Sequence, residues 1–171
     1  MKPLLAVSLS LATLPAPGML RVGDQSLAPA SCATRNTLWI RHYAAALYVP
    51  PRASPAAALE DPKVAKALQV EILNKAFLPR QMPQRWQLAL AAELDRASLG
   101  SIDAAWRRLG AGDRVTIAYA PGPGVSLRVN GRLVAAAPTH RLVDALLHTW
   151  AEDEPVSERV SRVVARHPCG R

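Results

Sequence analysis

The stretch that decides the fold is residues 113–137, with the sequence DRVTIAYAPGPGVSLRVNGRLVAAA. Apolar and polar side chains alternate along it in three short runs, which is typical of half-buried β-strands. The first two runs are separated by Pro-Gly-Pro-Gly at residues 121–124, and the last two by Asn130-Gly131, the strongest short hairpin signal. Residues 113–137 therefore predict a three-stranded antiparallel meander.

The segments on either side of the meander predict further strands and helices. Before it, we expect a turn-rich segment, a long strand, a helical turn, a second strand and two helices, at residues 22–29, 37–49, 54–59, 67–73, 83–94 and 101–109. After it, apolar residues recur at helical spacing over residues 139–150 and 156–166. This order favours an α+β fold with an antiparallel sheet and helices on one face. The sequence contains no repeat and no sign of a second core.

The composition limits the class of protein. Of the 171 residues, 21 are Lys or Arg and 13 are Asp or Glu, which gives a net charge of +8. The basic residues are scattered, without the clusters and aromatic interleaving typical of nucleic-acid surfaces, so we expect no nucleic-acid partner. Half of the residues are hydrophobic, which argues against global disorder.

The N-terminal segment has the architecture of a secretory signal peptide. Lys2 precedes an apolar run, and Ala16 and Gly18 provide small residues at the cleavage spacing. We therefore expect residues 1–18 to be a signal peptide and residues 19–171 to form a single exported domain, periplasmic or secreted. No apolar run reaches the length of a spanning helix, so we expect no transmembrane segment in the mature form.

The two cysteines, Cys32 and Cys169, lie near the ends of the expected mature chain. In an oxidising compartment such a pair suggests one disulfide. The alternative is two unrelated thiols or a nucleophile, although no CxxC motif is present. We favour the disulfide.

The sequence offers little for a metal or cofactor. His140, Asp144 and His148 would form one row on a helix, but the two histidines would lie about 12 Å apart along the axis. We interpret the row as a solvated face and expect no metal. Metalloprotease, hydrolase, Walker and dinucleotide motifs are absent from the sequence.

Arg35 precedes a strand that carries two tyrosines, Tyr43 and Tyr48. On a strand over residues 37–49, Trp39 and Tyr43 would share one face, and a nearby guanidinium could clamp a carboxylate or an enolate. The alternative is a surface arginine beside two core-edge tyrosines.

Three segments in this order resemble the chalcone isomerase-like family. They are Arg35 with WIRHYAAALYVP at residues 39–50, residues 112–132 from GDRV to VNGR, and residues 138–150 followed by Pro155-Val156. The resemblance covers roughly residues 23–165 and is best with the bacterial, signal-bearing branch. It implies an open-faced β-sandwich, in which a large antiparallel sheet is covered by a helical layer with the ligand cleft between them.

The resemblance also implies a function. Plant enzymes of the family cyclise chalcones to flavanones without a cofactor, and related non-catalytic members bind fatty acids. Arg35 matches the arginine that meets the anionic end of the ligand, whereas Tyr43 replaces a catalytic threonine. The family often has glycine at the position of Cys32, which fits a disulfide with Cys169.

We therefore expect a non-catalytic protein that binds a small hydrophobic or amphipathic carboxylate such as a fatty acid. Arg35 would pair with the carboxylate, Trp39 and Tyr43 would shape the pocket, and Tyr48 would contribute. The alternatives are an intramolecular lyase of the chalcone isomerase type, with Arg35 and Tyr43 as candidate catalytic residues, and an envelope adaptor without a ligand.

Overall fold

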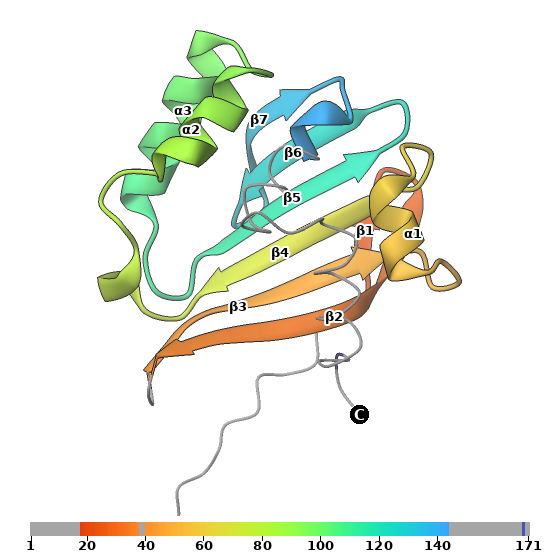
Figure 1. The fold of residues 1–171 in the computed structure, drawn as a ribbon, viewed down its shortest axis with the longest axis horizontal. Helices are drawn as coiled ribbons and strands as arrows, with labels where there is room; N and C mark the ends of the chain where they lie inside the picture. Colours follow the sequence, from red (N-terminus) through yellow and green to blue (C-terminus); the bar gives the residue numbers. More distant parts are fainter. Residues whose placement is uncertain (1–17, 38–39, 144–168, 170–171) are drawn as a thin grey trace, which may run out of the picture.

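A computed structural model describes residues 18–37, 40–143 and 169 of the chain. Its main feature is a seven-stranded antiparallel sheet in which every strand pairs with the next along the chain (Figure 1). The strands are β1 (Leu20–Val22), β2 (Gln25–Thr37), β3 (Ile40–Val49), β4 (Lys66–Ile72), β5 (Arg114–Ala120), β6 (Gly124–Val129) and β7 (Arg132–Ala137). The helices are α1 (Pro55–Glu60), a 3-10 helix (Lys75–Phe77), α2 (Gln84–Ala91) and α3 (Arg96–Arg108).

The meander predicted from residues 113–137 is confirmed as β5, β6 and β7. Asn130 and Gly131 both adopt positive φ angles, 51° and 80°, as a two-residue hairpin turn of the primed type requires. In the other turn, Gly122 and Gly124 also have positive φ. Local turn chemistry therefore fixes the register of this half of the sheet.

One side of the sheet packs against the helices, and we call it the helix side. Alternate strand residues such as Leu47, Ile117 and Leu127 form its core together with Leu90 of α2 and Ile102 of α3. In space, α3 packs against β7 (Figure 1). The helical layer expected on one face is therefore present.

The opposite side, which we call the hairpin side, is covered in part by β1 and the beginning of β2. Val22 and Leu27 pack there against a floor of small residues contributed by β3, β4 and β5, namely Ala46, Ala67, Ala118 and Ala120. A Cβ atom built on Gly23 would lie 3.7 Å from the Cβ of Ala120. Small side chains on the floor are what allow a strand pair to approach the sheet so closely.

The first half of the sheet corrects the sequence-based expectation. Residues 22–29 were expected to be turn-rich and residues 37–49 to be one strand, but β2 spans Gln25–Thr37 and β3 begins only at Ile40. Pro29 lies in β2 at a register irregularity between Pro29 and Ser31, a position where a strand tolerates a residue without an N–H. Arg35 therefore lies within a strand and not before one.

The helices agree with expectation in type and differ in length. The helix expected at 83–94 is α2, which ends at Ala91, and the one expected at 101–109 is the longer α3. Asp95 starts α3 earlier because its carboxylate accepts a hydrogen bond from the Ser98 backbone N–H at 2.7 Å.

No helix in the described part of the chain is long and apolar enough to cross a membrane. Residues 1–17, 38–39, 144–168 and 170–171 lie outside it. The expected helix at 156–166, most of the expected helix at 139–150 and all but residue 18 of the expected signal peptide therefore fall outside the described residues.

Candidate functional site

Arg35 and Tyr43 occupy directly opposed positions on β2 and β3. Tyr43, Ala45 and Leu47 alternate along β3 on the helix side, since Leu47 belongs to the helix-side core. Opposed residues of an antiparallel pair share a face, so the Arg35 position also belongs to the helix side. Two of the expected ligand-binding residues are therefore neighbours, while Trp39 lies outside the described residues.

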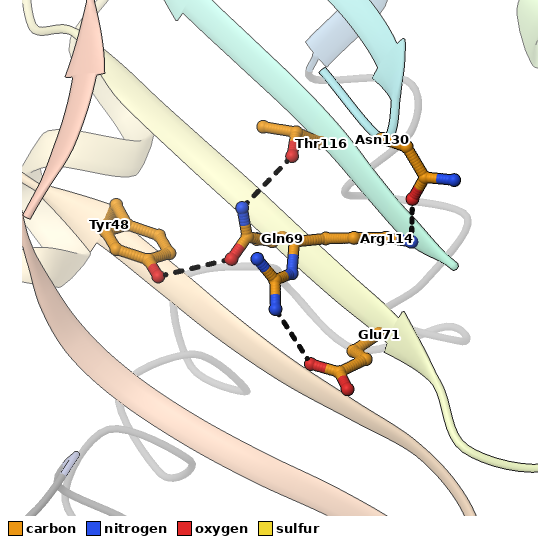
Figure 2. Close-up of polar contacts among 6 residues, drawn as sticks. All are labelled: Tyr48, Gln69, Glu71, Arg114, Thr116 and Asn130. Atoms are coloured by element: carbon orange, nitrogen blue, oxygen red, sulfur yellow. Dashed lines mark hydrogen bonds and ion pairs between the residues drawn. The ribbon is translucent and has the colours of Figure 1, made fainter. Parts of the chain in front are cut away.

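Tyr48 lies on the other side of the sheet. It is five residues after Tyr43, so strand alternation turns it to the hairpin side, where it is buried in the core formed with Ala46 and Ala67. Its hydroxyl donates to Oε1 of Gln69 at 3.4 Å (Figure 2). Burial raises the pKa of the Tyr48 phenol, and the positive charge of Arg114 opposes that rise. Because the sheet separates Tyr48 from Tyr43, we do not include Tyr48 in the candidate site.

The polar groups around Tyr48 bond to one another. Gln69 also donates from Nε2 to the hydroxyl of Thr116 at 3.2 Å (Figure 2). Beside this pair, Arg114 forms an ion pair with Glu71 at 3.2 Å (Figure 2). These contacts run across neighbouring strands, where opposed polar pairs stabilise the sheet. We interpret this row as structural.

Hydrogen bonds of Asp113 and Asn130 connect the meander to the segment that follows α3. The Asn130 side chain accepts from the backbone N–H of Arg114 and donates to Asp113, each at 2.8 Å. The other oxygen of Asp113 accepts from the Gly110 N–H at 2.7 Å. The hydrogen bonds from Asn130 and Gly110 lower the pKa of the Asp113 carboxyl. The pKa shift here results from a turn and does not mark a reactive group.

Lys66 is the most unusual residue of the helix side, because its side chain is 1% exposed. Its Nζ donates to the backbone oxygen of Asp61 at 3.0 Å and lies 2.9 Å from Nε2 of His140. The same ammonium lies 5.6 Å from the centre of the Tyr119 ring, and His140 contacts that ring edge-on. Tyr119 in turn donates to the backbone oxygen of Pro62 at 2.5 Å. Lys66, Tyr119 and His140, which we call the Lys66 cluster, come from three separate segments of the chain.

The Lys66 cluster was not among the features predicted from the sequence. A signal was present, since Lys66 alternates with Leu68 and so belongs to the inward face of its strand. His140 was considered only as part of a row with Asp144 and His148, two residues outside the described part. Within the described part, no group of three His, Cys, Asp or Glu side chains could hold a metal ion.

Ser31 is a further polar residue on the helix side, opposed to Leu47 across the strand pair. It is 4% exposed, and its hydroxyl has no hydrogen-bond partner in the described part of the chain. Ser31, Ala33 and Arg35 alternate on β2, so Ser31 lies four residues, or roughly 13 Å, from the Arg35 position.

A cavity of about 300 Å³ lies between α2 and α3. Its lining is mainly aliphatic and consists of Met82, Gln87, Leu88, Leu90, Ala91, Leu99, Ile102 and Asp103. Leu88 at this cavity is 64% exposed, an unusual state for a leucine beside a helix–helix contact. The two helices are also joined by Trp86 and Trp106, whose ring centres lie 6.3 Å apart.

The helical layer, the large antiparallel sheet and the small strand pair on its opposite side together define an open-faced β-sandwich. The chain belongs to the chalcone isomerase-like family, whose model matches residues 8–162. The expected fold class and family are thereby confirmed.

A solved structure with the same fold is the crystal structure of a fatty-acid binding protein of Arabidopsis thaliana. It shares 16% sequence identity with this chain, with a TM-score of 0.51, and the match covers 88% of this chain and 90% of the other. At that identity the likeness concerns the fold alone. A comparison with curated proteins gives no match.

Finally, Cys32 and Cys169 form a disulfide, as expected from their positions. Cys32 packs against the hairpin-side core, so the disulfide attaches Cys169 to β2. No other cysteine is present in the sequence.

Proposed function

We propose that this protein is a non-catalytic binding protein for a small amphipathic carboxylate such as a fatty acid. The observation that carries the proposal is the opposition of Arg35 and Tyr43 on the helix side of β2 and β3. A guanidinium is the side chain best suited to hold a carboxylate, because its N–H groups match both oxygens. The family and the fatty-acid binding protein of the same fold support this reading.

In this proposal Arg35 pairs with the carboxylate, and Trp39 and Tyr43 form apolar walls near the polar end of the ligand. The remainder of the ligand lies against the apolar helix side of the sheet, where Ala45 and Val70 are the next opposed pair beyond Tyr43 and Ile72. Tyr43 stands where the catalytic enzymes of the family have a threonine. The larger phenol narrows the site, which favours binding over ring closure.

We further propose that the protein belongs to the exported, signal-bearing branch of the family and works in the periplasm or outside the cell. The apolar segment before residue 19 supports export. The disulfide agrees with an oxidising compartment. N-terminal sequencing of the protein recovered from the periplasm tests this point, with Met19 as the expected first residue.

The binding proposal is tested by native mass spectrometry of protein purified from the periplasm. We expect a co-purifying lipid in the wild type and its loss in Arg35→Ala. Arg52→Ala is the matched control, because Arg52 is an exposed arginine in the turn after β3 and its removal changes the net charge equally.

Two results would contradict the proposal. One is equal retention of the lipid in Arg35→Ala and Arg52→Ala. The other is an empty wild-type protein that converts a chalcone to a flavanone, which would assign the site to the isomerase.

A further inference from the structure

We propose that the cavity between α2 and α3 is a second ligand site, which takes an aliphatic molecule with a hydrogen-bond-donating head group, such as a fatty alcohol. Its volume of about 300 Å³ lies at the lower end of the range for small-molecule sites. This site is independent of the carboxylate site proposed above.

The lining specifies an aliphatic ligand. Five of the residues that form the walls are leucine, isoleucine or methionine, and none is aromatic. Met82 is buried and its flexible thioether adapts to an irregular chain. Leu88 is largely exposed, and a bound chain would remove part of its apolar surface from water, which is favourable in proportion to the area covered.

The charge of the rim specifies the head group. Asp103 is the one ionisable residue among those that line the cavity in the described part of the chain. Its side chain is 47% exposed and is paired with Arg107 one turn further along α3. Gln87 donates one N–H to the backbone oxygen of Met82 at 2.6 Å, which leaves its second N–H and its amide oxygen available at this rim. An alcohol suits this rim, because its hydroxyl can donate to the Asp103 carboxylate and accept from the Gln87 amide. A fatty acid suits it less, because the described lining contains no cation and the charge of Asp103, which Arg107 offsets only in part, repels a second carboxylate.

The two sites are far apart. Arg35 lies on β2, whereas α3 packs on β7 and α2 packs on α3. β7 is five strand spacings from β2, or roughly 24 Å at about 4.8 Å for each spacing. Figure 1 shows α2 and α3 side by side beyond β7, at the opposite edge of the sheet from β2. Occupation of one site therefore leaves the other open.

The test is a titration of the oxidised protein with octanol, followed by backbone amide shifts in NMR. We expect saturable shifts confined to α2, α3 and the loop that carries Met82, with octanoate at least about tenfold weaker. Ala91→Trp should abolish octanol binding, because Ala91 lines the cavity yet is exposed, so a large side chain fills the cavity without entering the core. Ala92→Trp is the control: it is the next residue, also exposed, and outside the cavity lining.

Asp103→Asn tests the head group separately from the walls. Removal of the negative charge should narrow the preference for octanol over octanoate, with octanol binding itself reduced less than in Ala91→Trp. The inference is overturned if octanoate binds as well as octanol to the wild type, if Ala91→Trp and Ala92→Trp bind octanol equally, or if Arg35→Ala removes the octanol shifts. It is also overturned if Ala91→Trp converts a dimer to a monomer, since the apolar opening would then belong to an interface between copies.

Discussion

Lys66 and His140, 74 residues apart in the chain, bring Nζ and Nε2 to 2.9 Å from each other at a partly buried position. Lys66 also donates to the backbone oxygen of Asp61, so one ammonium connects the loop before β4 with the segment after β7. At one end of the helix side, a partly buried polar contact therefore joins these segments in addition to the apolar packing.

Replacement of Lys66 by methionine should lower the free energy of unfolding by about 1–3 kcal/mol, because the partly buried backbone oxygen of Asp61 loses its donor. Lys63→Met is the control, since Lys63 lies in the same loop but is exposed, and we expect a change within about 0.5 kcal/mol. Urea denaturation of both variants measures the difference. Equal stability of the two variants would show that the Lys66 cluster contributes nothing.

Gly124 should tolerate no side chain. Its φ is +83°, and a Cβ there would overlap the carbonyl oxygen of Ala137 and lie 2.7 Å from the Cα of Pro138. Gly122 has a similar φ of +91° but open space around it. We expect Gly122→Ala to destabilise by about 1 kcal/mol and Gly124→Ala by more than about 3 kcal/mol, because only the latter adds a backbone clash to the conformational strain. Thermal unfolding of the pair checks this, and similar melting temperatures would contradict it.

The disulfide should contribute strongly to stability. It closes a loop with a sequence separation of 137 residues, for which the chain-entropy model gives an upper value of about 5 kcal/mol. We expect the double variant Cys32→Ala/Cys169→Ala to lose a large part of this stabilisation free energy. A thiol titration of the unreduced, denatured wild type should detect no thiol, and a count of two would refute the pairing.

Tyr48 should make the protein sensitive to alkali. Burial raises the pKa of its phenol, so the folded state favours the neutral form. The associated stability is fully present below the unfolded pKa of about 10 and is lost as the pH rises through the folded pKa. Tyr48→Phe should therefore lose less stability than the wild type between about pH 9 and about pH 11. Parallel melting curves for both proteins across this range would contradict the assignment.

Ser31 should be dispensable for folding. Its buried hydroxyl has no hydrogen-bond partner in the described part of the chain, so Ser31→Ala removes a polar group whose burial is not compensated. We expect the variant to be as stable as the wild type or up to about 2 kcal/mol more stable. A clear loss of stability, measured by denaturant titration, would mean that the hydroxyl is bonded in solution.

The second half of the sheet was predictable because its signals are local. Residues 113–137 combine period-two alternation with two turns whose glycines and Asn130 adopt the positive φ angles that such turns need. By contrast, the segment SLAPASCATRNT within β2 has no apolar alternation and contains Pro29. Its extended conformation comes from pairing with β1 and β3, which propensity along the chain does not reveal.

The types of residue in the candidate site could be predicted from the sequence, but their spatial arrangement could be predicted only in part. The opposition of Arg35 and Tyr43 required the register of β2 on β3, which depends on the missed strand. The separation of Tyr48 from Tyr43 was already implied by their odd spacing on one strand. The contact between Lys66 and His140 joins distant segments, so no local pattern could give it.

The bond between Cys32 and Cys169 makes the intervening chain a covalent ring that contains β3 to β7 and all four described helices. A protease that cuts any one loop inside this ring, such as the turn at residues 121–124, opens the ring without releasing a fragment. The two new ends remain attached through β2 and can re-pair in their original register. A single cleavage therefore leaves both parts of the chain covalently joined, and release of a fragment requires either a second cut or prior reduction of the disulfide.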